Sequence, residues 1–307
     1  MTEESYNNIK ACQLYGIYPF SFYKALEALK KDGKRLIYDI DDALDLIDPS
    51  NPFYYAVKKD AGSAMEILPY IDHITAATPK LKEYISKKTN APVTVIPNCF
   101  DMAEQQFARP KRTGIRIGFV GASPHVPDLT MVLPAVRKAQ ERHPEVVFII
   151  MGFGKESYAE WYGSMRRLSS DEGLKELESF DKALAGIRFE WVPFVDYEIY
   201  PRVLANMSLD IGLCPIKDMP FNEHRSTSKA MEYTLSGALA MASNRLPFTE
   251  DQSSYLVDDG QWEKELEHFI VNPELRAMFH KRHYDWVMGN RNIEGQLANL
   301  KTAYGII

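Results

Sequence analysis

The sequence predicts an α/β protein built from two parallel sheets, each with helices packed on both faces. Short continuous apolar runs alternate with amphipathic stretches, a pattern typical of strands buried on both faces of a parallel sheet. The chain has 307 residues, which is a length typical of two domains. A stretch from 98 to 113, with Pro110 and three basic residues, separates two series of such runs.

The first series alternates helices and strands. Apolar residues at helical spacing predict a helix over 20–30. A second helix is predicted over 79–88, because Thr78 is suited to an N-cap and Pro79 to the first helical turn. The predicted strands of this series are 11–17, 35–40, 71–76 and 92–96.

The second series contains more strands than the first. Apolar residues predict a helix over 129–139, and another over 226–236 that ends at Gly237, a residue type common at helix ends. The long connection 155–186 is predicted as a helix plus a loop. The predicted strands are 115–120, 146–151, 187–191, 209–214 and 238–243, and the tail is helical with apolar stripes over 262–270 and 293–304.

Composition and charge exclude several classes of protein. The formal net charge of -6 and the pI of about 5.7 argue against a dedicated nucleic-acid binder, although a local basic groove is compatible with both. Cys12, Cys99 and Cys214 are too few and too far apart for a disulfide framework or a zinc site. No apolar run reaches the roughly 20 residues of a membrane span, and the acidic start does not resemble a signal peptide. We therefore expect a cytoplasmic enzyme without a transmembrane segment.

A glycine-bearing turn follows the first strand of the second series. Gly121, Ala122 and Ser123 come directly after the predicted strand 115–120 and lead into a helix. Backbone N–H groups in such a turn can approach a phosphate closely. A tight turn required only by the fold explains the same residues equally well. His125, later in this loop, is the histidine whose position most favours a functional role.

The segment 221–233 carries two cations and one carboxylate at helical spacing. Arg225, Lys229 and Glu232 stand at positions i, i+4 and i+7, and they therefore share one face of the predicted helix. The cations and the helix N-terminus suit the charge of a nucleoside diphosphate, and the carboxylate suits ribose hydroxyls. Ligands of parallel sheets bind outside the carboxyl ends of the strands, where this helix begins. The alternative is a solvated charged face with an ion pair between Lys229 and Glu232.

An acidic group ends the predicted strand 35–40. Asp39, Asp41 and Asp42 suit a divalent metal or a substrate hydroxyl, and the first two match the D-x-D pattern of metal-dependent sugar transferases. The alternative is that Asp41 or Asp42 caps the turn after the strand.

Several segments follow the order of landmarks known from one family. They are 36–44 with 49–52, 74–81, 95–101, 117–129, 210–215, 220–222 and 226–233. Over most of its length the chain resembles the retaining, family-4-type glycosyltransferases of GT-B fold, in particular a bacterial and phage group with an Asp-rich first-domain motif. The resemblance implies two Rossmann-like domains with parallel sheets facing across a cleft, and a C-terminal helix that returns to the first domain. The expected domains are residues 1–108, joined by helices at about 280–307, and residues 113–279.

The resemblance also implies an enzyme that moves a hexose or pentose from a nucleotide-sugar donor to a hydroxyl acceptor with retention of configuration. The second domain would hold the donor, with a UDP-sugar favoured over a GDP-sugar, and the first domain would face the acceptor. No metal or other cofactor is expected. The implied donor-binding residues are Gly121, Ala122, Ser123, Asn222, Ser226 and Glu232, and the implied catalytic residues are Arg225, Lys229, His125 and, on the acceptor side, Asp41.

Three alternatives stay open at this point. The acceptor is a glycan or another hydroxyl-bearing molecule, but a phage-type enzyme acting on hydroxymethylated DNA would use a cleft lined by basic residues. Basic clusters occur at 80–88, 109–112, 166–167 and 281–282. A metal held by Asp39 and Asp41 would keep sugar transfer but change its chemistry. The third alternative is a degenerate transferase that binds a nucleotide or sugar without turnover.

Overall fold

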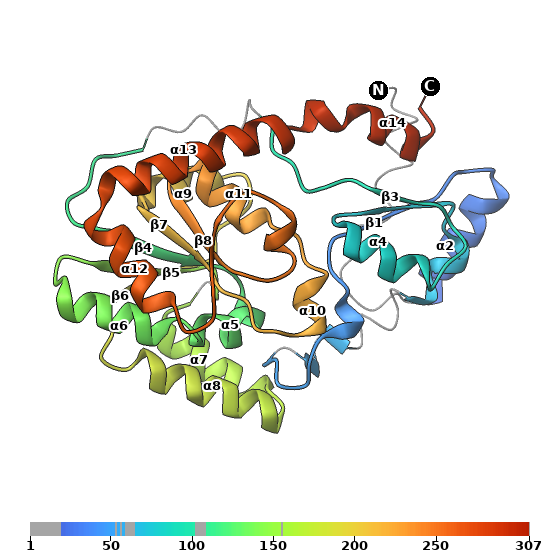
Figure 1. The fold of residues 1–307 in the computed structure, drawn as a ribbon. Helices are drawn as coiled ribbons and strands as arrows, with labels where there is room; N and C mark the ends of the chain where they lie inside the picture. Colours follow the sequence, from blue (N-terminus) through green and yellow to red (C-terminus); the bar gives the residue numbers. More distant parts are fainter. Residues whose placement is uncertain are drawn as a thin grey trace.

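The computed structural model describes residues 20–306, with gaps at 53, 56, 59–64, 102–108 and 155. Within this part of the chain, two separate parallel sheets form two lobes, joined by a linker and by the C-terminal helices (Figure 1). The predicted strand at 11–17 lies outside the described residues. No helix in the described ranges is long and apolar enough to cross a lipid bilayer.

The first sheet has its described strands in the order β1-β2-β3, all parallel. The helices and strands of this lobe are α2 (Phe20–Lys31), β1 (Ile37–Ile40), η2 (Leu44–Leu46), η3 (Leu68–Tyr70), β2 (His73–Ala76), α4 (Pro79–Ser86) and β3 (Val93–Val95). The predicted cap of α4 is confirmed, since the Thr78 hydroxyl accepts a hydrogen bond from the Leu81 N–H at 3.1 Å. Leu26, Ile74 and Ile85 belong to one buried core around this sheet.

The second sheet has the order β6-β5-β4-β7-β8-β9, and all its described strand pairs are parallel. The bounds are β4 (Arg116–Val120), β5 (Val147–Met151), β6 (Phe189–Val192), β7 (Ile211–Cys214), β8 (Leu239–Ser243) and β9 (Tyr255–Val257). The strand order changes direction between β4 and β7, which opens a crevice at their carboxyl ends. The sequence predicted every strand here except β9, whose apolar run is only three residues long.

Helices cover both faces of the second sheet (Figure 1). The described helices are η5 (Ser123–His125), α5 (Val126–Thr130), α6 (Leu133–Arg142), α7 (Tyr158–Leu168), α8 (Asp171–Leu184), α9 (Tyr200–Met207), α10 (Pro220–Glu223), α11 (Ser228–Leu235), η6 (Phe248–Glu250), α12 (Trp262–Val271), α13 (Pro273–Asn290), η7 (Ile293–Gln296) and α14 (Leu297–Tyr304). The helix predicted over 129–139 is two helices, because Pro134 stands in the first turn of α6 and has no N–H to continue α5. The connection 155–186 holds two helices, and the Ser157 and Ser170 hydroxyls cap them.

The apolar residues of the central strands point alternately into two cores. Phe148 and Ile150 of β5 belong to the core that contains Trp161, whereas Ile149 of the same strand belongs to the core that contains Tyr233. Burial on both faces confirms the pattern predicted from the continuous apolar runs. The carboxyl ends of the strands are therefore where polar side chains can gather around a ligand.

The tail returns to the first lobe, as predicted. Helix α13 packs against α11 and β8, while α14 contacts β2 and β3 (Figure 1). The linker and the tail run side by side where they cross between the lobes, since the Phe100 N–H donates to the Arg291 carbonyl at 2.9 Å and the Ile293 N–H donates to the Phe100 carbonyl at 3.1 Å. The chain crosses back to the first lobe after Asn290, where α13 ends. The predicted domain boundaries stay a prediction. Within the predicted stripe over 293–304, Leu297 is half-exposed and does not belong to the core.

Candidate functional site

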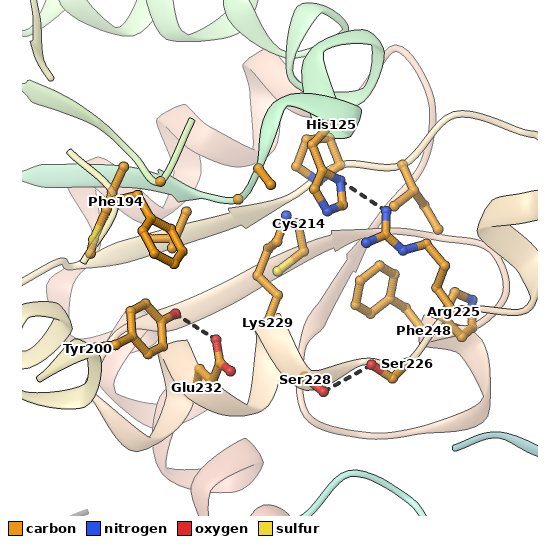
Figure 2. Close-up of a pocket in the computed structure, with 18 of the residues that line it drawn as sticks. His125, Phe194, Tyr200, Cys214, Arg225, Ser226, Ser228, Lys229, Glu232 and Phe248 are labelled. Atoms are coloured by element: carbon orange, nitrogen blue, oxygen red, sulfur yellow. Dashed lines mark hydrogen bonds between the residues drawn. The ribbon is translucent and has the colours of Figure 1, made fainter. Parts of the chain in front are cut away.

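A cavity of about 360 Å³ lies at the carboxyl ends of β4, β5 and β7 (Figure 2). Seven of the residues singled out from the sequence line it together. They are Gly121, Ala122, His125, Arg225, Ser226, Lys229 and Glu232. The structure thus brings the glycine-bearing turn together with Arg225 and the charged residues of α11, although Gly121 and Arg225 are 104 positions apart in the chain.

Three other predicted residues do not line this cavity. The Ser123 hydroxyl donates to the Phe153 carbonyl at 3.0 Å and accepts from the indole N–H of Trp161 at 2.9 Å, so it faces the core. Asn222 holds the loop after β7, and Asp41 lies on the first lobe.

Two glycines leave room on the floor of the cavity. A Cβ atom on Gly121 would lie 3.0 Å from Phe119 Cε1 and 3.1 Å from both Lys229 Nζ and His125 Cδ2. Gly152 follows β5 with φ +98°, and a Cβ there would lie 2.8 Å from the Gly121 carbonyl oxygen. Backbone can therefore approach a ligand closely at both strand ends.

Lys229 of α11 and Arg225, which stands before that helix, point into this cavity (Figure 2). The helix predicted over 226–236 begins only at Ser228, so Arg225 lies in the turn that leads into α11. Lys229 Nζ lies 4.2 Å from the centroid of the Phe119 ring, an arrangement that favours the charged amine. Burial nevertheless lowers the pKa of Lys229 to about 8, and the neighbouring Arg225 guanidinium acts in the same direction. These two cations give this side of the cavity a positive charge, which suits an anionic ligand.

Glu232 lies one turn further along α11 (Figure 2). The Tyr200 hydroxyl donates to Glu232 Oε2 at 2.6 Å, and the other carboxylate oxygen has no hydrogen bond to any described residue. Burial raises the pKa of Glu232, while the hydrogen bond from Tyr200 and the charge of Lys229 oppose that rise. The free carboxylate oxygen can accept a ligand hydroxyl.

His125 is held in one orientation. Its Nδ1 lies 2.9 Å from Asp128 Oδ2, and Asp128 Oδ1 accepts from the Lys217 N–H at 2.8 Å and from Asn222 Nδ2 at 3.1 Å. Burial, followed by the charges of Arg225 and Lys229, lowers the pKa of His125 to about 3, so the ring is neutral. Because an ionised carboxylate only accepts hydrogen bonds, we assign the ring proton to Nδ1 and a lone pair to Nε2.

The first lobe places its acidic group beside this cavity. Arg225 Nε lies 3.5 Å from Asp42 Oδ1, and Arg225 Nη1 lies 3.3 Å from His125 Nδ1. Burial raises the pKa of Asp41 to about 6, with repulsion from Asp42 and Asp39 adding to the effect. Among the described residues, no group of three or more His, Cys, Asp or Glu side chains is arranged to hold a metal ion.

Comparison with solved structures identifies the fold. HepE from Anabaena, solved in complex with UDP-glucose, superposes with a TM-score of 0.63 at 12% identity, covering 92% of this chain and 75% of that one. Sucrose-phosphate synthase from Thermosynechococcus elongatus gives a TM-score of 0.63 at 14% identity, with 92% and 70% covered. The trehalose-6-phosphate synthase OtsA gives 0.60 at 12% identity, with the same two coverages.

The chain has the GT-B fold. The fold that the sequence resemblance implied is thereby confirmed. No protein-family model and no curated protein matches the sequence. In this GT-B chain, the cavity belongs to the second lobe, and the acidic segment of the first lobe stands against its rim through Asp42 and Arg225.

Sequence reasoning missed part of the cavity wall. Phe194, Val195, Tyr197 and Tyr200 line it from the connection after β6, and Cys214 lines it from the end of β7. The rule that ligands bind at the carboxyl ends of parallel strands could have found them, because all five follow or end a strand that was predicted. The four residues after β6 carry no motif, whereas Cys214 lies in the landmark segment 210–215.

Proposed function

We propose that this GT-B chain is a glycosyltransferase that moves a sugar from a nucleotide-sugar donor to a hydroxyl acceptor with retention of configuration. The observation that carries the proposal is the convergence of Arg225, Lys229 and Glu232 in one cavity above Gly121 and Gly152. A UDP-sugar is the favoured donor. The complex of the similar HepE structure with UDP-glucose supports that choice.

The proposed roles follow from charge and position. Lys229 and Arg225 stabilise the diphosphate as its bond to the sugar breaks, because negative charge develops there in the transition state. The start of α11 adds a partial positive charge. Glu232 accepts the ribose hydroxyls, and Tyr200 fixes the carboxylate that does so. Most of the catalysis then consists of positioning the donor against the acceptor.

The acceptor enters from the side of the first lobe in this proposal. Asp41 and Asp42 lie there, and carboxylates suit the hydroxyl groups of a glycan. A polyanion such as DNA would meet these carboxylates at the rim, and the similar structures give no support for a DNA partner. We also propose that transfer needs no bound metal, so activity should survive a strong chelator unchanged.

Binding measurements with matched variants test the donor site. Calorimetric titration with UDP and UDP-glucose should give clear binding to the wild type, and at least tenfold weaker binding to Lys229→Ala, Arg225→Ala and Glu232→Ala. Lys264→Ala, on the exposed face of α12, is the control and should bind like the wild type. Unchanged binding by Lys229→Ala and Glu232→Ala would contradict the proposal.

A donor and acceptor screen tests the reaction itself. The purified protein is incubated with UDP- and GDP-sugars and a panel of hydroxyl acceptors, and products are identified by mass spectrometry. Sugar transfer with the anomeric configuration retained is the expected result. Tight nucleotide binding without turnover across the whole panel would favour the non-catalytic alternative.

A further inference from the structure

Asn98, a residue of the linker between the lobes, contacts the start of helix α11. Asn98 belongs to the chain crossing between the lobes, and its Nδ2 lies 2.7 Å from Ser228 Oγ and 3.1 Å from Ser226 Oγ. The two hydroxyl oxygens are 2.9 Å apart (Figure 2). Both serines line the donor cavity next to Arg225 and Lys229.

Asn98 Nδ2 and the hydroxyls of Ser226 and Ser228 form a triangle of hydrogen-bonding groups. Counting the protons of this triangle shows that one hydroxyl proton is left to donate to a ligand. An amide nitrogen donates and does not accept, so neither serine can give its proton to Asn98 Nδ2. Ser226 and Ser228 have one hydroxyl proton each, and at most one of these lies in the bond between them. At least one hydroxyl proton therefore has no acceptor among the described residues of the triangle. It sits at the wall of a cavity that carries two cations.

The C-terminal tail, which also crosses between the lobes, holds Thr227, the residue between the two serines. Arg291, just after α13, donates to Thr227 Oγ1 at 3.0 Å and to Asp251 Oδ2 at 2.7 Å. The Thr227 hydroxyl in turn donates to Asp251 Oδ2, so it does not cap the start of α11. Asn98 and Arg291, which both lie outside the second sheet and its connections, thus donate hydrogen bonds to the hydroxyls at the start of α11.

We propose that Asn98 is a positioning residue of the donor site, which directs a hydroxyl proton of the Ser226–Ser228 pair to an oxygen of the donor diphosphate. The inference rests on the proposed function. As the bond from sugar carbon to phosphate oxygen breaks, its electron pair stays on the diphosphate, and the directed hydroxyl donates to that growing charge. Donor affinity then depends on a residue in the linker.

A double-mutant cycle tests this role. Four proteins are compared: the wild type, Asn98→Ala, the double variant Ser226→Ala/Ser228→Ala, and the triple variant. The probes are UDP, inorganic pyrophosphate and uridine, with affinities measured by titration calorimetry. Asn98→Ala should weaken UDP and pyrophosphate about three- to tenfold, in line with a hydrogen bond to a charged group, and leave uridine unchanged. In the serine double variant, the same change should have no further effect.

Two further variants separate positioning from simple packing. Asn98→Asp keeps the shape but replaces the donor by an acceptor, and it should weaken UDP at least as much as Asn98→Ala does. Asn299→Ala, which removes an exposed amide on α14, is the control and should bind like the wild type. A purely structural role for Asn98 would lower the melting temperature and weaken UDP equally in the presence and absence of the serines.

The outcomes distinguish this inference from the function on which it rests. If the wild type binds UDP but the Asn98 effect persists in the serine double variant, or extends to uridine, the positioning role is overturned and the donor site stands. If the wild type binds neither UDP nor pyrophosphate, both proposals are overturned.

Discussion

On the proposed function, the lowered pKa of Lys229 should make donor binding sensitive to pH. Burial, with Arg225 adding to it, lowers the pKa of this amine to about 8. A bound diphosphate would surround the amine with negative charge and raise its pKa well above that value. Below pH 8 Lys229 is already charged, so affinity is flat, and above pH 8 binding must take up a proton, so affinity falls.

The size of the effect follows from this pKa. The fraction of charged Lys229 is about 90% at pH 7 and about 10% at pH 9, which corresponds to roughly a tenfold loss of UDP affinity, or about 1.4 kcal/mol. The loss should grow about tenfold per pH unit until the pKa of the bound state is reached. Lys229→Arg provides the matched control, because a guanidinium keeps its charge throughout this range.

Calorimetric titration with UDP between pH 7 and pH 9 measures both quantities. Repeating the titration in buffers of different ionisation enthalpy counts the protons taken up, which should approach one at pH 9 for the wild type and stay near zero for Lys229→Arg. Titration of UDP itself is common to both proteins and cancels in the comparison. A flat wild-type profile, or an equal fall in Lys229→Arg, would refute the assignment.

Three glycines give further expectations. Gly121→Ala should weaken UDP binding about tenfold or more and lower the melting temperature, because the added methyl group would lie 3.0 Å from the buried Phe119 ring and 3.1 Å from His125 Cδ2 and Lys229 Nζ, so these side chains must shift; calorimetric titration and thermal unfolding of both proteins check it. Gly212→Ala should destabilise the fold by about 1–3 kcal/mol or more, since its Cβ would overlap the buried Tyr233 ring, and urea unfolding measures this. Gly237→Ala should cost about 1–2 kcal/mol because this residue ends α11 at φ +88°, and equal stability of the two proteins would contradict that reasoning.

The strands and helix α11 were predictable because their signals are local. Continuous apolar runs specify strands covered on both faces, and every run predicted between 35 and 243 became a strand. Pro134 also indicates the break between α5 and α6, but the apolar residues keep their helical spacing across this break, so the spacing predicts one continuous helix. β9 gave too short a run to be distinguished from a loop.

The candidate site was predictable where its residues lie close together in the chain. Helical spacing placed Arg225, Lys229 and Glu232 on one face, and the structure directs all three into the same cavity. The spacing could not show that Ser123 turns to the core, because its partners lie 30 and 38 residues away.

The sequence by itself determined the α/β class, the alternation of strands and helices in two series, and the grouping of Arg225 with Lys229 and Glu232, since each depends on neighbours along the chain. Tertiary structure alone decided the contacts between distant segments: Asp42 with Arg225, Tyr200 with Glu232, and Asn98 with Ser228. The physical reason is that the residues next to a polar side chain in the sequence do not indicate which distant residue it will contact. Which side chains form hydrogen bonds and ion pairs with one another depends on how the sheets and helices pack. In this GT-B chain, that packing sets both the charge and the hydrogen bonds of the cavity.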